Sequence, residues 1–205
     1  MHLAVWSLAS ASSFASLSLG LCVGSGGPAK RFRSSAAATA ATGDAATTPS
    51  RRVFCDLDGV LCDFEAGVVK TTGLRVEEFM SIGTMWSELA RAEPGFYSSL
   101  DWMSDGRDLW AAIAVLEPTI LTGLPRGKWA SPQKITWCAR ELGPDVPVIT
   151  CMARDKHKHG GAGDVLIDDR IKAKEPWEDM GGLFVHHQTT EQTLRELQRL
   201  SLLPG

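Results

Sequence analysis

The chain has 205 residues, of which 44% are hydrophobic and 22% are charged, and its formal net charge is -3. This length suits one domain with a sizeable core, and the composition is that of an ordinary soluble globular protein. The small negative charge excludes a general electrostatic attraction to nucleic acid or to an anionic membrane. Any phosphate that the protein binds must therefore be held by local cations, a metal ion or backbone N–H groups.

The five cysteines are odd in number and scattered, and no two of them form a C-x-x-C pair. This usage favours buried free thiols in a reducing compartment over a disulfide framework or a zinc site.

Residues 1–50 differ in composition from the rest of the chain. An apolar, serine-laced run (residues 3–23) precedes a basic patch (residues 30–33) and an Ala/Ser/Thr tract, and residues 1–43 contain no acidic side chain. We predict a removable targeting segment, whose order resembles a bipartite plastid presequence or otherwise a mitochondrial one. The alternatives are an unprocessed disordered tail on a cytoplasmic protein and a membrane anchor, which the serines in the run disfavour. We expect no membrane attachment of the mature form.

From residue 51 onward, strand patterns and helix patterns alternate. Short apolar runs predict strands near residues 53–55, 118–123, 146–151, 165–167 and 182–185. Helical spacing predicts helices from residue 64 to 70, in one or two pieces within 74–91, and at 105–114, 131–142 and 190–200. Asp105 and Ser131 are the predicted caps of two of these helices. Alternation of this kind indicates an α/β fold with a Rossmann-like parallel sheet of about five strands and helices on both faces.

Two aspartates, Asp56 and Asp58, follow the first predicted strand and precede Gly59. Residues i and i+2 of a strand point to the same side, so both carboxylates are expected to aim at one spot, and the glycine allows a sharp turn beyond them. Like charges in such a place repel each other, and a cation is the usual remedy. The alternative is an Asx-type turn with both carboxylates solvated.

Polar residues also follow the other predicted strands. The carboxyl ends of parallel strands meet at one edge of a sheet, where open α/β folds place ligands. Carboxylates with no Cys or His among them favour a hard cation, Mg²⁺ above all. The set comprises Asp56, Asp58, Thr122, Gly123, Lys156, Asp168 and Asp169.

These motifs resemble the four motifs of the haloacid-dehalogenase-like (HAD) phosphohydrolases. The chain is more specifically similar to the 5'(3')-deoxyribonucleotidases, with which it shares further segments in the same order. The resemblance covers about residues 52–188 and implies a HAD-like phosphatase domain at 51–205 with a small helical cap at about 65–104. The segments that carry it are 56–60, 63–65, 121–123, 132–134, 143–145, 154–156, 166–170 and 176–178.

The resemblance implies a Mg²⁺-dependent phosphomonoester hydrolase that works through an aspartyl-phosphate. Asp56 would be the nucleophile and a metal ligand, and Asp58 the acid and base that also offers its backbone carbonyl to the metal. Asp168 would be a further metal ligand, with Asp169 behind it fixing waters or a lysine.

Phosphate binding is assigned by the same resemblance. Thr122 and the Gly123 N–H would hold the phosphate oxygens, and Lys134 and Lys156 would neutralise charge in the transition state. The family tends to have serine where Gly123 stands, so one side-chain donor is lost. Lys156 matches the motif context, but Lys158 stands nearer the usual distance from Asp168, and we favour Lys156.

The histidines are not expected to bind the metal, because Mg²⁺ rarely takes imidazole. We interpret His157 and His159 as exposed loop residues. His186 and His187, which close the fifth predicted strand, receive the same interpretation.

Aromatic residues of the implied cap are either cap core or a wall for a nucleobase. Phe64, beside the first motif, is the preferred base-stacking residue, and Trp86 is the second. The resemblance thus implies a 5'-nucleotidase that acts on (deoxy)ribonucleoside monophosphates, in deoxyribonucleotide catabolism.

Other functions compete with this interpretation. The same chemistry could act on a phosphorylated sugar or on the phosphate end of a nucleic acid, although the lack of a basic surface argues against long nucleic acid. A catalytically silent HAD-like binding module is disfavoured because every needed side chain is present. A glycosyltransferase-type D-x-D would leave Asp168, Asp169 and the lysines unexplained. The expected partner is a small phosphomonoester, and a homodimer is left open.

Overall fold

The computed structural model describes residues 51–205. The predicted targeting segment, residues 1–50, lies outside the described residues. Among the helices of the described part, none is long and apolar enough to cross a membrane.

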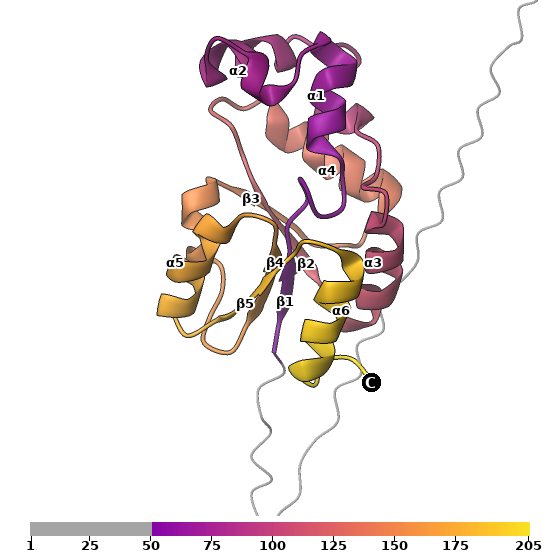
Figure 1. Cartoon of the computed structure of the whole chain (residues 1–205), viewed down its shortest axis with the longest axis vertical. Coiled ribbons are helices and arrows are strands. Elements are labelled where there is room, and N and C mark those ends of the chain that lie inside the picture. Colours follow the sequence, from indigo (N-terminus) through magenta and orange to yellow (C-terminus); the bar gives the residue numbers. More distant parts are fainter. Residues whose placement is uncertain (1–50) are drawn as a thin grey trace, which may run out of the picture. The chain divides into compact units, whose positions relative to one another are not determined.

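Five parallel strands form one sheet in the order β3-β2-β1-β4-β5 (Figure 1). The change of direction in strand order beside β1 is where folds of this type open a crevice at the carboxyl edge. The predicted α/β class and all five strands are confirmed. The strands are β1 (Val53–Cys55), β2 (Thr119–Gly123), β3 (Val148–Cys151), β4 (Val165–Asp168) and β5 (Leu183–His186).

Helices cover both faces of the sheet, because successive strand residues point to opposite sides. On one face, alternate strand residues such as Val53 and Ile167 pack with α3 (Gly106–Ile113), α4 (Ala130–Glu141) and α6 (Thr190–Arg199). On the other face, residues such as Phe54 and Leu166 pack with Trp177 of α5 (Lys174–Asp179). Phe54 and Trp177 meet edge to face at 5.4 Å.

A small helical unit follows β1 and lies beyond the carboxyl ends of the strands, where Figure 1 shows α1 and α2. It contains α1 (Phe64–Thr72), α2 (Ile82–Leu89) and the 3₁₀ turns Val76–Glu78 and Tyr97–Ser99. Further 3₁₀ turns are Ala114–Leu116, Ala153–Lys158 and Ile171–Ala173.

The ends of α1 and α2 are set by capping groups. The Asp63 carboxylate accepts the Ala66 N–H at 2.9 Å, Gly73 ends α1 in the left-handed conformation, and Ser81 caps α2 through the Thr84 N–H. These caps fix where Phe64 and α2 stand above the sheet.

Two capping expectations were wrong, each because a distant partner prevailed over the local pattern, and one helix was missed. Asp105 precedes α3, but its carboxylate accepts the Thr190 N–H at 2.8 Å and so caps α6 instead. Ser131 lies inside α4, and its hydroxyl pairs with that of Thr150 at 2.9 Å. Helix α5 was not predicted because it has six residues and buries only Trp177, too few for a helical period to appear.

Candidate active site

Asp56 and Asp58 stand on the loop that leaves β1, and both line the same cavity. Asp56 is buried, and one of its carboxylate oxygens accepts the Leu57 N–H at 2.8 Å. Gly59 has φ +73°, and a Cβ there would lie 2.5 Å from an Asp169 carboxylate oxygen. Glycine is therefore required both for the turn and for the approach of Asp169.

Lys156 is the cation at the floor of the site. It is 3% exposed, and its Nζ lies 2.7 Å from Asp56 Oδ2 and 2.6 Å from Asp168 Oδ2. Burial works against its charge, but the two carboxylates outweigh burial and raise the pKa of Lys156 above its ordinary value, so the ammonium persists. Lys158 is exposed and pairs with Asp155. The structure therefore places Lys156, not Lys158, among the aspartates.

Asp56, Asp168 and Asp169 form an acidic cluster whose members each offer one oxygen within 4.8 Å of the others. Asp168 is held by the Arg170 N–H at 2.8 Å, whereas Asp169 Oδ1 is buried with no hydrogen-bond partner among residues 51–205. A buried carboxylate oxygen without a partner is costly, and an all-oxygen donor set suits a hard divalent cation. The cluster thus fits a metal ion.

One detail of this cluster differs from the sequence interpretation. The Asp169 carboxylate, expected behind the ligands, lies with those of Asp56 and Asp168.

The carboxyls of the cluster are hard to ionise together. Burial, followed by the charge of Asp56, raises the pKa of Asp168 to about 6. Burial, with the charges of Asp56 and Asp168, raises the pKa of Asp169 to about 7. Burial and the neighbouring carboxylates thus disfavour the ionised forms of Asp168 and Asp169 where no cation balances the charge.

These shifts predict a pH-dependent response to metal. Asp168 and Asp169 bind protons more tightly in the folded chain, so their contribution to stability is full below the ordinary pKa of 3.8 and is lost as the pH rises through about 6 and 7. A bound cation removes this penalty. We expect Mg²⁺ to raise the melting temperature more at pH 8 than at pH 5, as measured by thermal unfolding with and without the metal.

The control for this prediction is Asp169→Asn, which removes one carboxylate from the cluster. The variant should lose most of the Mg²⁺-dependent gain at pH 8. Equal gains at the two pH values in the unaltered protein would contradict the assignment of the cluster as a metal site.

Asp58 is held by a lysine behind the cavity wall. Lys134 is fully buried on α4, and its Nζ donates to Asp58 Oδ2 at 2.6 Å and to Thr122 Oγ1 at 2.8 Å. Burial raises the pKa of Asp58 above its ordinary value, although Lys134 opposes this effect. Lys134 and Thr122 do not line the cavity. Lys134 contacts the cavity residue Asp58, and Thr122 contacts Lys134.

Gly123 ends β2 and lines the cavity directly. A Cβ at this position would lie 3.0 Å from the Ala153 Cβ, which is closer than side chains normally approach. The close packing of β2 against the loop after β3 leaves little room for a side chain here. A backbone N–H is the donor that this position can offer.

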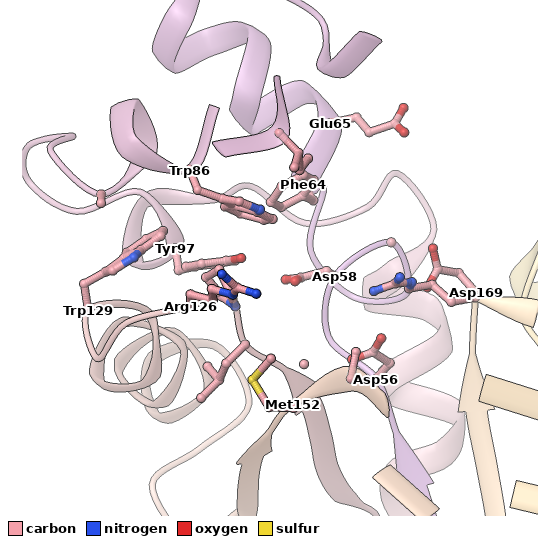
Figure 2. A pocket seen from close by; sticks show the side chains of 18 of the residues that line it. Asp56, Asp58, Phe64, Glu65, Trp86, Tyr97, Arg126, Trp129, Met152 and Asp169 are labelled. Atoms are coloured by element: carbon pink, nitrogen blue, oxygen red, sulfur yellow. The ribbon is translucent and has the colours of Figure 1, made fainter. Parts of the chain in front are cut away.

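The cavity has a volume of ≈ 1240 Å³ and an aromatic wall above its acidic floor (Figure 2). Phe64 and Trp86 contribute from α1 and α2, and their ring centroids are 5.6 Å apart. Tyr97 and Trp129 stack at 5.5 Å on a neighbouring part of the wall. The site therefore offers a charged floor for one end of a ligand and flat apolar surfaces for the other.

Most of the residues proposed from the sequence meet at this cavity. Those that line it are Asp56, Asp58, Phe64, Trp86, Gly123, Lys156 and Asp169. Thr122 and Lys134 lie behind the wall. Asp168 is 1% exposed and lines a smaller adjoining hollow, which shares Lys156 with the main cavity.

The four histidines among residues 51–205 lie outside the acidic cluster. His157 is half-buried, not exposed as expected, with an Nδ1 that has no partner among these residues, and His159 is also half-buried. His187 is buried, again not exposed as expected, and pairs with the Thr193 hydroxyl at 2.9 Å. His186 Nε2 lies 3.0 Å from the Asp169 backbone oxygen.

Arg126 and Trp129 also line the cavity, but the sequence analysis did not predict them as site residues. Both lie on the loop between β2 and α4, and Figure 2 shows the Arg126 guanidinium pointing into the cavity. Their position shortly after Gly123 was the available signal, because a loop that leaves a strand's carboxyl end begins at the ligand-binding edge. Tyr97 was noted only as a cap aromatic.

No protein-family model matches this chain, and no curated protein is significantly similar to it. Among solved structures it is similar to a hydrolase from Streptococcus pneumoniae TIGR4, with 14% sequence identity and a TM-score of 0.44. The match covers 74% of this chain and 98% of that one. The functional case rests on the residues of this chain.

Proposed function

We propose that the protein is a HAD-class phosphatase, a Mg²⁺-dependent hydrolase of phosphomonoesters that acts on (deoxy)ribonucleoside monophosphates as a 5'-nucleotidase. The observation that carries this proposal is the position of Asp56. Its carboxylate lies at the floor of an aromatic-walled cavity, beside Lys156 and within 4.8 Å of the oxygens of Asp168 and Asp169. This is the arrangement that the four sequence motifs imply.

In the first step, an Asp56 carboxylate oxygen attacks phosphorus and forms an aspartyl-phosphate while the ester P–O bond breaks. The bond from the Leu57 N–H to Asp56 Oδ1, at 2.8 Å, orients the carboxylate. Forming the covalent intermediate divides one difficult displacement into two easier ones.

Asp58 supplies the proton that the leaving alkoxide needs. Burial raises its pKa, which favours a protonated form, and Lys134 fixes the position of the carboxyl group. In the second step Asp58 takes a proton from water, which attacks the aspartyl-phosphate, releases phosphate and regenerates Asp56.

The negative charge of the phosphate is balanced locally, as the acidic composition of the chain requires. Lys156 and Gly123 both line the cavity, and the ammonium of the first and the backbone N–H of the second would contact phosphate oxygens at its floor. Mg²⁺ held by Asp56, Asp168 and Asp169 would supply the positive charge that offsets repulsion between Asp56 and the phosphate.

The proposal is tested by purifying the protein and measuring phosphate release from nucleoside monophosphates, sugar phosphates and phosphorylated oligonucleotide ends, with Mg²⁺ or with a chelator. We expect turnover of nucleoside monophosphates that needs the metal. No turnover of any of these compounds would refute the phosphatase assignment. Preference for a sugar phosphate or for a nucleic-acid end would refute the nucleotidase assignment alone.

The aromatic wall predicts a specific effect of Phe64→Ala. Stacking of a base on an aromatic side chain contributes about 1–3 kcal/mol, so we expect the KM for a nucleotide to rise about tenfold. The KM for ribose 5-phosphate, which has no base, should change little. Steady-state kinetics on both substrates measures this difference.

Phe79→Ala is the matched control, because Phe79 packs on the core from the same cap and does not line the cavity. A Phe64 variant with an unchanged nucleotide KM, or with equal changes for both substrates, would exclude base stacking at Phe64.

A further inference from the structure

Tyr97 is the most firmly held side chain of the aromatic wall. It is 2% exposed, it stacks on Trp129, and it meets Phe96 edge to face at 4.9 Å. The Lys134 ammonium lies 4.3 Å from the centre of the Tyr97 ring, and the Tyr97 backbone N–H donates to the Gln133 side chain at 2.9 Å. The ring therefore cannot turn away to place its hydroxyl elsewhere.

The hydroxyl of Tyr97 faces the cavity, with no hydrogen-bond partner among residues 51–205. Figure 2 shows it directed across the open space toward Asp58. Burial, and next the charge of Asp58, raises the pKa of Tyr97 well above its ordinary range, so the group keeps its proton and can donate. Because this hydroxyl opens to the cavity, a ligand that displaces water from it must accept its proton or leave it unpaired, which is costly.

The position beside Asp58 indicates which part of a ligand would lie there. If Asp58 protonates the leaving oxygen, as the proposed function requires, the first carbons of the substrate's alcohol lie between Asp58 and the aromatic wall. Tyr97 then faces the substituents on those carbons. An apolar substituent would leave the hydroxyl unpaired, whereas an oxygen would accept its proton.

We propose that Tyr97 is a specificity-determining residue whose hydroxyl donates to a hydroxyl oxygen on the alcohol portion of the substrate. The inference rests on the proposed function and narrows it to phosphomonoesters of polyols, such as nucleotides that keep a free sugar hydroxyl. A site that hydrogen-bonds a substrate hydroxyl discriminates strongly against the analogue that lacks it, because its own polar group is then left unpaired.

The test compares Tyr97→Phe with the unaltered protein on a ribonucleoside 5'-monophosphate and on its 2',3'-dideoxy analogue. Phenylalanine keeps the ring, the stack on Trp129 and the contact with Lys134, so the fold should persist. We expect kcat/KM to fall about tenfold on the ribonucleotide and less than twofold on the dideoxy analogue, as for the loss of one hydrogen bond.

Ser87→Ala is the matched control, because Ser87 also lines the cavity but its hydroxyl already donates to the Gly83 carbonyl at 2.9 Å. It should change the ratio of kcat/KM values for the two substrates less than twofold.

Equal losses on both substrates in Tyr97→Phe, or no loss on either, would overturn the inference while leaving the phosphatase intact. If the unaltered protein turned over neither substrate, the nucleotidase proposal would fail, and this inference with it.

Discussion

Asp56→Asn is expected to abolish turnover, with kcat falling roughly 10³-fold or more. The amide of asparagine cannot attack phosphorus to form the acyl-phosphate, and the cluster with Asp168 and Asp169 loses one charged ligand. An asparagine oxygen can still accept the Leu57 N–H, so the loop after β1 should keep its conformation. Phosphate release measures the rate, and acid quenching of the reaction measures the covalent intermediate, which should be absent.

The control for this prediction is Asp101→Asn. Asp101 is an exposed carboxylate that pairs with Lys70 outside the cavity, and its replacement should leave turnover nearly unchanged. An Asp56 variant that retained a tenth or more of the turnover would show that another residue is the nucleophile.

Lys156→Met is expected to have the largest effect on stability. Methionine fills similar volume without charge, and it leaves Asp56 and Asp168 as buried carboxylates with no ammonium beside them. Removing one partner of a buried ion pair costs about 3–5 kcal/mol. Denaturant unfolding in the absence of metal measures this loss, which added Mg²⁺ should partly offset. Turnover should fall roughly 100-fold or more, because a cation at the phosphate is lost.

Lys158→Met is the matched control, two residues away on the same loop. Lys158 is exposed and pairs only with Asp155, so its replacement should cost about 0.5 kcal/mol or less. Comparable losses in the two variants would contradict the role of Lys156 and would reopen the choice between the lysines that sequence spacing leaves undecided.

The strands were predictable from the sequence, because buried parallel strands are short continuous apolar runs that end in polar turns. The run before Asp56 and the run before Asp168 became adjacent strands of the sheet, β1 and β4. Capping was less predictable. Asp105 and Ser131 found partners 85 and 19 residues away in the chain, and no local pattern contains such contacts.

Within the candidate site, the sequence determined which chemical groups gather. Parallel strands bring their carboxyl ends to one edge, so Asp56, Lys156 and Asp168 had to lie near one another once their strands were identified. The same reasoning placed Gly123 at this edge, where the Ala153 Cβ leaves little room for a side chain.

Only the tertiary structure decided how these groups are paired. It buried Lys134 behind Asp58, left Lys158 in solvent, brought the Asp169 carboxylate into the acidic cluster and turned the Tyr97 hydroxyl into the cavity. The physical reason is that strand order determines only which loop a residue occupies, whereas pairing requires that two side chains come within contact distance. Whether they do so depends on the packing of segments far apart in the chain, which a local sequence pattern does not encode.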